Sequence, residues 1–394
     1  MSKILVISAR AIEYNSSSII CLRALVDGLS VENEVHIISP HPVKNSRYYV
    51  EDFEWKTKNV KITYYDKEPE VSAGAVDNSS SKKGIKAFIY RMYKRYDLFG
   101  KAIFDLKYAN HILEMIDRES FDYIISASDP VVSHMLANKI RKVNKRGYYI
   151  QYWGDPLAMD ISASSRLPHW MKAKIENKIL AKADKVVYVS PLTLLEQKKI
   201  YPKHKNKMYF VPTPTICEKE ERNSIENKVV LGYFGNYDSG IRNIVPLYET
   251  VKKRNNVELY IIGDSDLKLE ETPNIHILGR INPEELDAYI NKCNVLVDIM
   301  NIRGTQIPAK IYRDAGTSKE VLLIEDGDLG SELKNFLGKY NRYTFVENMS
   351  DKIDSIVSDY MKNGVPDRKP IQEFLPYHVA KEVVKNEKNS YCDK

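Results

Sequence analysis

Short hydrophobic runs alternate with longer amphipathic stretches along the first half of the chain. Runs rich in Val, Ile and Tyr predict strands at 4–7, 35–38, 60–64, 123–125, 148–152 and 185–189. Between the first two runs, apolar residues recur every three or four positions from 19 to 29, which predicts a helix. Strands that alternate with helices are typical of a parallel sheet covered on both faces. The first half therefore predicts an α/β domain.

The alternation is interrupted by the proline-containing segment 211–214 and the charged stretch 218–228, and then it starts again. Runs that predict strands follow at 229–234, 259–262, 275–278, 295–299 and 321–324, with a helix at about 247–253. A chain of 394 residues exceeds what one hydrophobic core normally supports. We therefore predict two doubly wound domains, 1–208 and 209–373, joined by a linker.

The composition is that of a globular protein, with 43% hydrophobic and 28% charged residues. No apolar run approaches the roughly 20 residues that span a bilayer. The first apolar run is too short for a signal peptide and reads as a strand. The four cysteines have neither metal-ligand nor disulfide-framework spacing. These features predict a protein of the reducing cytoplasm.

The net charge of +6 is concentrated in one segment. Between 82 and 101, seven basic residues accompany one acid, and apolar residues from 85 to 103 recur at helical spacing. Such a helix could lie on an anionic membrane surface, or it could be an ordinary amphipathic helix with a solvated basic face. The candidate membrane contacts are Lys86, Arg91, Lys94 and Arg95. No nucleic-acid recognition motif accompanies the charge, so we expect no nucleic-acid partner.

Three blocks of sequence stand in a fixed order, at 176–190, at 231–236 with Arg242 and Asn243 downstream, and at 307–316. Together with the segment 211–214 they resemble family 4 of the GT-B glycosyltransferases, whereas residues 40–120 match no family pattern. The resemblance implies two Rossmann-like domains that face a cleft, with the acceptor on the first domain and a nucleotide-sugar donor on the second. It also implies that a last helix, about 374–394, packs back on the first domain.

A nucleotide-sugar transferase must hold a diphosphate and stabilise it as it departs. The resemblance implies that no metal does this, so backbone amides and basic side chains must supply the positive potential. The glycines of the loop 235–240 let amides approach an anion, and the Arg242 fork suits phosphate oxygens. The resemblance places the third block, with Lys310, beside the donor. The donor-binding candidates are Gly235, Asn236, Arg242, Arg280, Ile281, Lys310 and Asp314.

The sequence departs from the family pattern at two acidic positions. The acid that binds the nucleotide ribose aligns with Arg313, so Asp314 is a candidate one position later, and the family's earlier Glu falls near Thr305. Asp264 and Asp266 after a strand could instead form a metal–diphosphate motif of the other large transferase fold. Because the family has a turn at this place, ordinary turn acids are the favoured interpretation.

The acceptor side requires a base in the first domain. Asp155 follows a strand and resembles the family's strand-end acid, which makes it the first catalytic candidate, and Asp129 after another strand is the second. Asp-Pro pairs are also common where helices start, which is the structural alternative for Asp129. Asn15, Ser16 and Ser17 open the first helix and could bind acceptor hydroxyls or simply cap that helix.

The sequence as a whole predicts an enzyme, a hexosyltransferase that moves a sugar from a nucleoside diphosphate sugar to a glycan. The resemblance implies retention of anomeric configuration and a role in cell-surface polysaccharide synthesis. Together with the basic amphipathic segment at 82–101, this role predicts a lipid-linked acceptor and a location on the inner face of the plasma membrane. A sugar-nucleotide epimerase and a non-catalytic partner protein with the same fold stay open. A dehydrogenase is not favoured, because residues 8–11 lack the dinucleotide glycine fingerprint.

Overall fold

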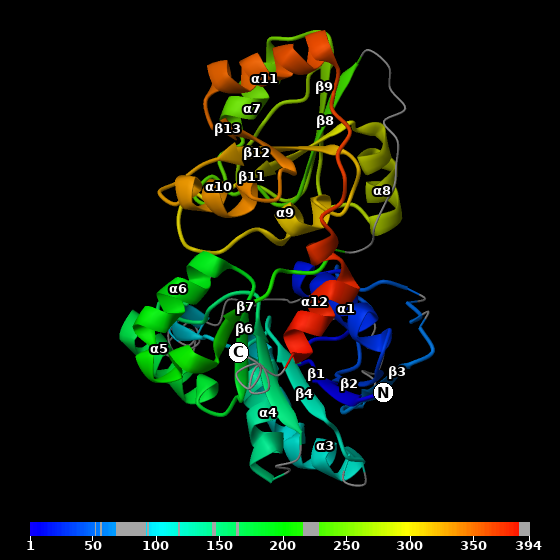
Figure 1. Cartoon of the computed structure of the whole chain (residues 1–394), viewed down its shortest axis with the longest axis vertical. Coiled ribbons are helices and arrows are strands. Elements are labelled where there is room, and N and C mark those ends of the chain that lie inside the picture. Colours follow the sequence, from blue (N-terminus) through cyan, green and yellow to red (C-terminus); the bar gives the residue numbers. More distant parts are fainter. Residues whose placement is uncertain are drawn as a thin grey trace, which may run out of the picture. The chain divides into compact units, whose positions relative to one another are not determined.

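The computed structural model describes residues 1–51, 53–55, 57–67, 92, 94–116, 119–143, 147–162, 165–215 and 228–385. The chain forms two compact units. Unit 1 contains Met1–Val211 and the chain from Ala380 onward, and unit 2 contains Pro212–Val379. Each unit is a parallel sheet with helices on its faces, which confirms the predicted α/β class (Figure 1).

Unit 1 is built on a sheet of seven parallel strands in the order β3-β2-β1-β4-β5-β6-β7. The strands are β1 (Lys3–Ile7), β2 (Glu34–Ser39), β3 (Val60–Tyr64), β4 (Tyr123–Ala127), β5 (Tyr148–Trp153), β6 (Lys185–Tyr188) and β7 (Met208–Phe210). The strand order changes direction between β1 and β4. In open parallel sheets, such a switch leaves a crevice at the carboxyl ends of the strands.

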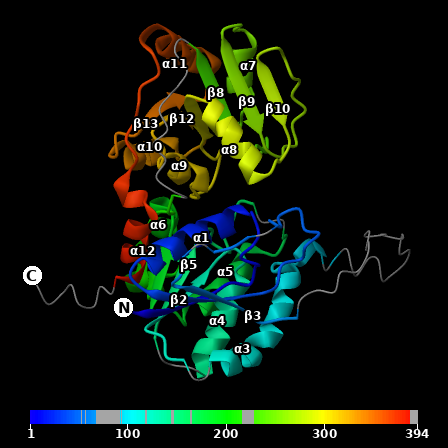
Figure 2. The same ribbon diagram turned by 90° about the vertical axis from the view of Figure 1, so that its right-hand side faces the viewer.

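Helices cover both faces of this sheet (Figure 2). Leu5 and Ile7 pack in one core with α3 (Ala109–Ile116), α4 (Val132–Val143) and α5 (His169–Leu180). Ile4 and Val6 point to the opposite face, where α1 lies, because side chains alternate along a strand. The remaining helices of unit 1 are η1 (Gly100–Tyr108), α1 (Ser17–Ser30), α6 (Pro191–Ile200) and η2 (Pro202–Lys207).

Unit 2 has six parallel strands in the order β10-β9-β8-β11-β12-β13, with its own switch between β8 and β11. The strands are β8 (Val229–Phe234), β9 (Val257–Ile262), β10 (Ile275–Leu278), β11 (Val295–Ile299), β12 (Glu320–Glu325) and β13 (Tyr343–Glu347). The helices are α7 (Val245–Lys252), α8 (Pro283–Lys292), α9 (Ala309–Asp314), α10 (Gly330–Gly338), α11 (Ser350–Asn363), η3 (Gln372–Phe374) and α12 (Pro376–Val384). Leu247 of α7 and Val357 of α11 share one core with Leu231 of β8.

The end of α12 lies in unit 1. The Lys185 ammonium of β6 donates hydrogen bonds to the carbonyls of Glu382 (2.9 Å) and Lys385 (3.0 Å). These carbonyls lie at the carboxyl end of the helix, where intrahelical partners run out, and a buried cation satisfies them there. Lys185 therefore connects the last described residues of the chain to the sheet of unit 1.

Several elements differ in detail from the sequence prediction. Strands β7 and β13 were not predicted, and α7 begins at Val245 rather than near 247. The helix expected over 85–103 is not continuous, because Asp97 accepts hydrogen bonds from the amides of Phe99 and Gly100 and the 3-10 helix η1 follows. In the part of the chain that the structure describes, no helix has both the length and the apolar character needed to cross a bilayer.

Candidate functional site

Two glycines meet where β8 and β9 end in unit 2. The Gly235 amide donates to the carbonyl of Ile262 (2.8 Å), and a Cβ atom on Gly263 would lie 2.2 Å from the Gly235 carbonyl oxygen. Gly263 also has φ +154°, a conformation that L side chains rarely adopt. Only glycine lets the two loops approach this closely. Gly235 was a donor-binding candidate from the sequence, whereas the requirement for glycine at 263 depends on this long-range approach.

Asn236 is the centre of a polar network on this loop. Its side-chain oxygen accepts hydrogen bonds from the Asp264 amide (3.3 Å) and from Arg280 (3.3 Å). Its carbonyl accepts from the Arg242 guanidinium (3.1 Å) and from the Tyr233 hydroxyl (3.0 Å). Two donor-binding candidates from distant parts of the sequence, Arg242 and Arg280, are therefore both bonded to a third. Arg242 lies in the turn before α7 rather than in the helix itself.

Lys310 lies beside this network. Its Cδ is 3.5 Å from the position of a Cβ on Gly235, and its ammonium lies 3.3 Å from the centre of the Tyr233 ring. The ammonium also forms a 3.4 Å ion pair with Asp298 of β11, and the two side chains are 9% and 0% exposed. Within the described residues, the ammonium makes no hydrogen bond. Lys310 is thus held between a ring face and a buried carboxylate.

Asp298 is an acid in the middle of an apolar strand. Burial raises its pKa, the neighbouring Asp314 raises it further, and Lys310 and Arg313 lower it. A buried carboxylate of this kind needs the cation beside it, because an uncompensated charge in the interior is costly. Asp298 therefore fixes Lys310 at the carboxyl edge of the sheet.

Asp314, the candidate for ribose binding, is buried at the end of α9. It accepts a hydrogen bond from Arg313 Nε (2.6 Å), and its carbonyl accepts one from Arg342 (3.1 Å). Its side chain is 6% exposed, compared with 25% for Arg313. Asp314 therefore serves an internal ion pair in this structure, and Arg313 is the more accessible partner. Ile281, another donor candidate, follows Arg280 and is half-buried.

Asp264 and Asp266 both have partners in neighbouring loops. Asp264 pairs with Arg280 (3.4 Å), and Asp266 accepts from the amide (2.8 Å) and hydroxyl (2.5 Å) of Ser239. The hydrogen bonds from Ser239 lower the pKa of Asp266. Across the described residues, no group of three or more His, Cys, Asp or Glu side chains is arranged to hold a metal ion. These two acids organise the glycine loop.

The carboxyl edge of the unit 1 sheet holds a pocket of about 360 Å³. Both catalytic candidates, Asp129 after β4 and Asp155 after β5, line it, and so do Arg10 after β1 and Lys101 of η1. Arg10 forms a 3.0 Å ion pair with Asp129. The pocket lies at the β1–β4 switch, the place where open parallel sheets bind ligands. The fold thus brings together two acids that are 26 residues apart in sequence.

Arg10 also reaches the loop that opens α1. Its guanidinium donates to the Ser18 hydroxyl (3.3 Å), which lies 3.3 Å from the Ser16 hydroxyl. Ser16 is the N-cap residue of α1, yet its side chain makes no capping hydrogen bond. Asn15 is half-buried and Ser17 is exposed. Of the three acceptor candidates, Ser16 is therefore connected through Ser18 and Arg10 to Asp129.

The predicted membrane contacts are only partly described. Lys86 and Arg91 lie outside the described residues, whereas Lys94 and Arg95 are exposed in the helical turn that precedes η1. Two apolar side chains of this turn, Met92 and Tyr96, are also exposed. The turn is joined to a later segment, because the Arg166 amide donates to the Arg95 carbonyl (2.9 Å). This turn therefore exposes both basic and apolar side chains to solvent.

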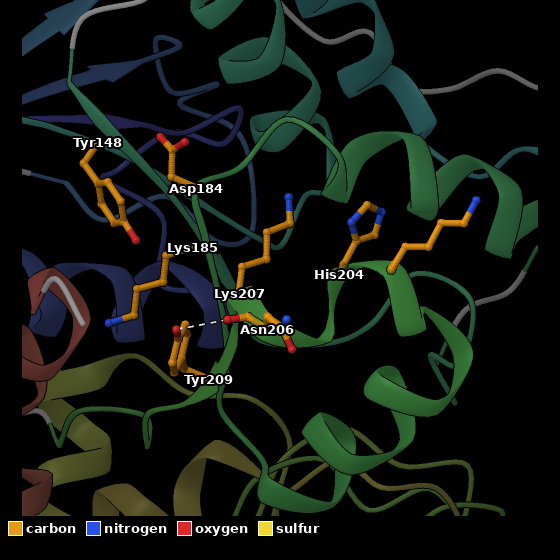
Figure 3. A pocket seen from close by; sticks show the side chains of 8 residues that line it. Tyr148, Asp184, Lys185, His204, Asn206, Lys207 and Tyr209 are labelled. Atoms are coloured by element: carbon orange, nitrogen blue, oxygen red, sulfur yellow. Dashed lines mark hydrogen bonds between the residues drawn. The ribbon is translucent and has the colours of Figure 1, made fainter. Parts of the chain in front are cut away.

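A second pocket of unit 1, of about 260 Å³, lies where β5, β6 and β7 begin (Figure 3). Its lining is basic, but the lysines point in different directions, and two of them, Lys185 and Lys207, are bound to carbonyls. Lys207 donates to Leu180 (2.8 Å) and Ala183 (2.7 Å) at the end of α5, and Lys185 binds the end of α12. This pocket joins helix ends to the sheet, at the edge opposite to Asp129 and Asp155.

Comparison with solved structures identifies the architecture, although no family model matches the chain and no curated protein matches its sequence. A structure of HepE from Anabaena with UDP and glucose superposes with a TM-score of 0.57 at 10% identity, covering 100% of this chain and 99% of that one. A glycosyltransferase from Rickettsia africae gives 0.57 at 15% identity, covering 98% and 99%. A putative UDP-N-acetylglucosamine 2-epimerase from Listeria monocytogenes gives 0.54 at 11%, covering 100% and 97%.

The chain has the GT-B fold. Within this GT-B fold, the sequence analysis missed three side chains that organise the two edges, Arg10, Tyr233 and Asp298. Asp298 had a detectable signal, since an acid interrupts an otherwise apolar run at 295–299. Arg10 and Tyr233 had none, because their roles depend on partners that are distant in sequence.

Proposed function

We propose that this protein is a glycosyltransferase that moves a sugar from a UDP-sugar to a glycan acceptor. The observation that carries the proposal is the convergence of the 235–236 loop, Arg242, Arg280 and Lys310 at the carboxyl edge of unit 2. Three cationic side chains and a close glycine crossing suit a diphosphate. The complexes of HepE with UDP and with UDP-glucose support UDP as the nucleotide.

The chemistry assigned to unit 2 is stabilisation of the leaving group. When the bond between the sugar C1 and the diphosphate oxygen breaks, negative charge accumulates on UDP. Lys310 and Arg242 would neutralise that charge, and no metal is required for this step. Lys310 suits the role because its ammonium is fixed by Tyr233 and Asp298 and therefore needs little reorganisation. We place Gly235, Asn236, Arg280 and Ile281 around the same donor.

The chemistry assigned to unit 1 concerns the acceptor hydroxyl. Asp155 and Asp129 line one pocket, and an ionised carboxylate there can accept the proton of an attacking hydroxyl. Asp155 is the preferred base, because it resembles the strand-end acid of family 4, and Asp129, which pairs with Arg10, is the second candidate. Asn15, Ser16 and Ser17 are proposed to hold further acceptor hydroxyls. By resemblance we propose retention of anomeric configuration and a place in family 4.

We further propose a lipid-linked acceptor, used in cell-surface polysaccharide synthesis. The exposed Lys94 and Arg95, beside the exposed Met92 and Tyr96, support contact with an anionic membrane surface on its cytoplasmic side. This part of the proposal extends to Lys86 and Arg91 on sequence grounds alone.

A sugar-nucleotide epimerase is the second candidate function. It is favoured by the similarity to the UDP-N-acetylglucosamine 2-epimerase structure from Listeria monocytogenes. An epimerase acts on the donor without an acceptor. The two functions therefore predict different products, either a new glycosidic bond or an isomerised donor.

The first experiment is thermal stabilisation by UDP, GDP, dTDP and CMP, each with and without a sugar, in EDTA. A ligand at about 100 times its dissociation constant adds roughly 2.7 kcal/mol to the free energy of unfolding. We expect a shift with UDP that is lost in Arg242→Ala and in Lys310→Ala. Product analysis by NMR then separates transfer from epimerisation. Absence of a shift with every nucleotide would favour a non-catalytic protein.

A further inference from the structure

A buried glutamate lies directly beneath the loop that carries Asp155. Glu176 is on α5 and is 0% exposed. Its Oε2 accepts a hydrogen bond from the backbone amide of Ala158 (2.8 Å) and another from the Tyr201 hydroxyl (2.9 Å). Ala158 is three residues after Asp155, so one helix side chain binds the backbone of the 154–160 loop.

Burying the ionised carboxylate of Glu176 at this position has an unfavourable free energy. Burial raises the pKa of Glu176 to about 7, although the hydrogen bonds from Ala158 and Tyr201 lower it. The other titratable groups around it are Tyr188 of β6, Tyr201, and Glu196 of α6, which adds repulsion. Within the described residues, no Lys, Arg or His pairs with the carboxyl, and its Oε1 has no hydrogen-bond partner. A group in this position lowers the stability of the fold when it is ionised.

The loop that Glu176 holds forms one wall of the unit 1 pocket. Asp155, Pro156, Leu157 and Asp160 all line that pocket, and Leu157 and Ala158 are buried next to the glutamate. The loop follows β5 and has no helix or strand hydrogen bonding of its own between 154 and 160. Its position therefore depends on individual anchors, and hydrogen bonds to a carboxylate are stronger than hydrogen bonds to a neutral acceptor.

We propose that Glu176 is a positioning residue whose carboxylate binds the 154–160 backbone and thereby fixes Asp155 at the acceptor pocket. The role of Asp155 in this statement rests on the proposed function, whereas the anchoring of the loop does not. The ionised carboxylate is the stronger acceptor, so the loop is best fixed above the pH at which Glu176 loses its proton.

The test compares Glu176→Gln with wild type, using hydrogen exchange of the 154–160 peptide at pH 6 and pH 8, corrected for intrinsic rates. Glutamine keeps an acceptor oxygen but carries no charge. We expect at least fivefold faster exchange in Glu176→Gln at pH 8, and wild-type protection that falls from pH 8 to pH 6 while that of the variant stays flat. The matched control is Glu114→Gln, an exposed glutamate of α3 in the same unit.

Thermal stability provides the readout that separates positioning from a merely structural role. A carboxyl group with a raised pKa favours the folded state below its unfolded pKa, and this contribution is lost as the pH rises through the folded pKa. Glu176→Gln should therefore melt at a higher temperature than wild type at pH 8, although its loop exchanges faster and its turnover of a UDP-sugar falls at least fivefold. A structural residue would move stability and turnover in the same direction.

Two results overturn the proposal. Equal exchange of the 154–160 peptide in wild type and Glu176→Gln at both pH values shows that the carboxylate does not hold the loop. Faster exchange with unchanged turnover shows that the loop does not position the reacting group. If wild type turns over no UDP-sugar at all, the proposed function fails, and the exchange measurement still decides whether Glu176 anchors the loop. Glu176→Ala, which removes every acceptor, should then exchange faster than Glu176→Gln.

Discussion

The two units share a topology but differ in the charges at their functional edges. Each is a parallel sheet with a switch next to its first strand, at β1–β4 in unit 1 and at β8–β11 in unit 2. At the unit 2 edge, Arg242, Arg280 and Lys310 gather around a glycine crossing, whereas at the unit 1 edge Asp129 and Asp155 line a pocket. The same fold therefore gathers three basic side chains around a glycine loop in one unit and two acids in a pocket in the other.

The residue that holds the functional side chain in place also has the opposite charge in the two units. In unit 2 a buried acid, Asp298, fixes a lysine, and in unit 1 a partly exposed arginine, Arg10, pairs with an acid. Two units of one fold can therefore carry different chemistry, because the side chains at the edge of each sheet determine it. A diphosphate is expected on unit 2 and an acceptor hydroxyl on unit 1.

The largest effect should come from Asp155→Asn. Removing a general base typically lowers turnover by about 100- to 10,000-fold, and UDP affinity should stay within about threefold because the donor lies on unit 2. Steady-state turnover of a UDP-sugar and calorimetric UDP binding measure the two quantities. Glu114→Gln, which changes an exposed acid of α3 in the same unit, is the control and should retain turnover. An equal loss of turnover in both variants would show that Asp155 is not the catalytic base.

Lys310→Ala tests the opposite edge. The loss of one charge-assisted contact to a diphosphate should weaken UDP binding by about 100-fold, roughly 2.7 kcal/mol. Calorimetry measures the affinity, and Lys334→Ala, which breaks an exposed ion pair with Glu325, is the control. If Lys310→Ala binds UDP as wild type does, the ammonium between Tyr233 and Asp298 is only structural.

Gly263→Ala tests the close approach on which the donor loop depends. A methyl group 2.2 Å from the Gly235 carbonyl must displace one of the two loops, at a cost of roughly 2–3 kcal/mol in the free energy of unfolding. Urea unfolding measures this cost. Gly279→Ala, where no atom lies within 4 Å of the added methyl group, should change stability by less than about 0.5 kcal/mol. Equal stabilities would show that the crossing is not constrained.

Lys310→Ala also predicts a pH dependence. Without the ammonium, the pKa of Asp298 rises further, because burial and Asp314 raise it and Lys310 opposes them. An acid with a raised folded pKa favours the folded state at low pH and loses this contribution as the pH rises. The stability deficit of the variant should therefore be larger at pH 8 than at pH 5, by about 1–2 kcal/mol. Urea unfolding at both pH values measures it, and a constant deficit would contradict the pairing.

The smallest effect concerns the membrane surface. Replacing Lys94 and Arg95 with Glu should weaken binding to phosphatidylserine vesicles by at least about 1 kcal/mol for each residue. Vesicle co-sedimentation measures the binding. The control replaces Lys252 and Lys253, two exposed lysines of unit 2, with Glu. If both double variants lose the same amount of vesicle binding, the binding depends on the net charge of the protein and not on Lys94 and Arg95.

The sequence predicted the strands well where apolar runs were distinct. The edge strands β7 and β13 were missed, because β7 has only three residues and β13 mixes buried and exposed positions. Doubly wound topology followed from the alternation alone, whereas the GT-B arrangement depended on three spaced blocks.

The candidate sites were only partly predictable. Arg242 and Lys310 could be proposed from phosphate chemistry and block order, and Asp155 from its place after a strand. Glu176 looked like an ordinary helix residue, because its partner Ala158 is 18 positions earlier in the chain. Hydrogen bonds between residues distant in sequence depend on how the elements pack, and the local pattern of apolar and polar residues does not reveal that packing.

The most direct test of the account is calorimetric titration of UDP, in EDTA, against wild type, Lys310→Ala and Asp155→Asn. We predict binding to wild type and to Asp155→Asn with dissociation constants within about threefold of each other, and about 100-fold weaker binding to Lys310→Ala. Equal binding by Lys310→Ala and wild type, or a loss confined to Asp155→Asn, would contradict the assignment of the donor to unit 2.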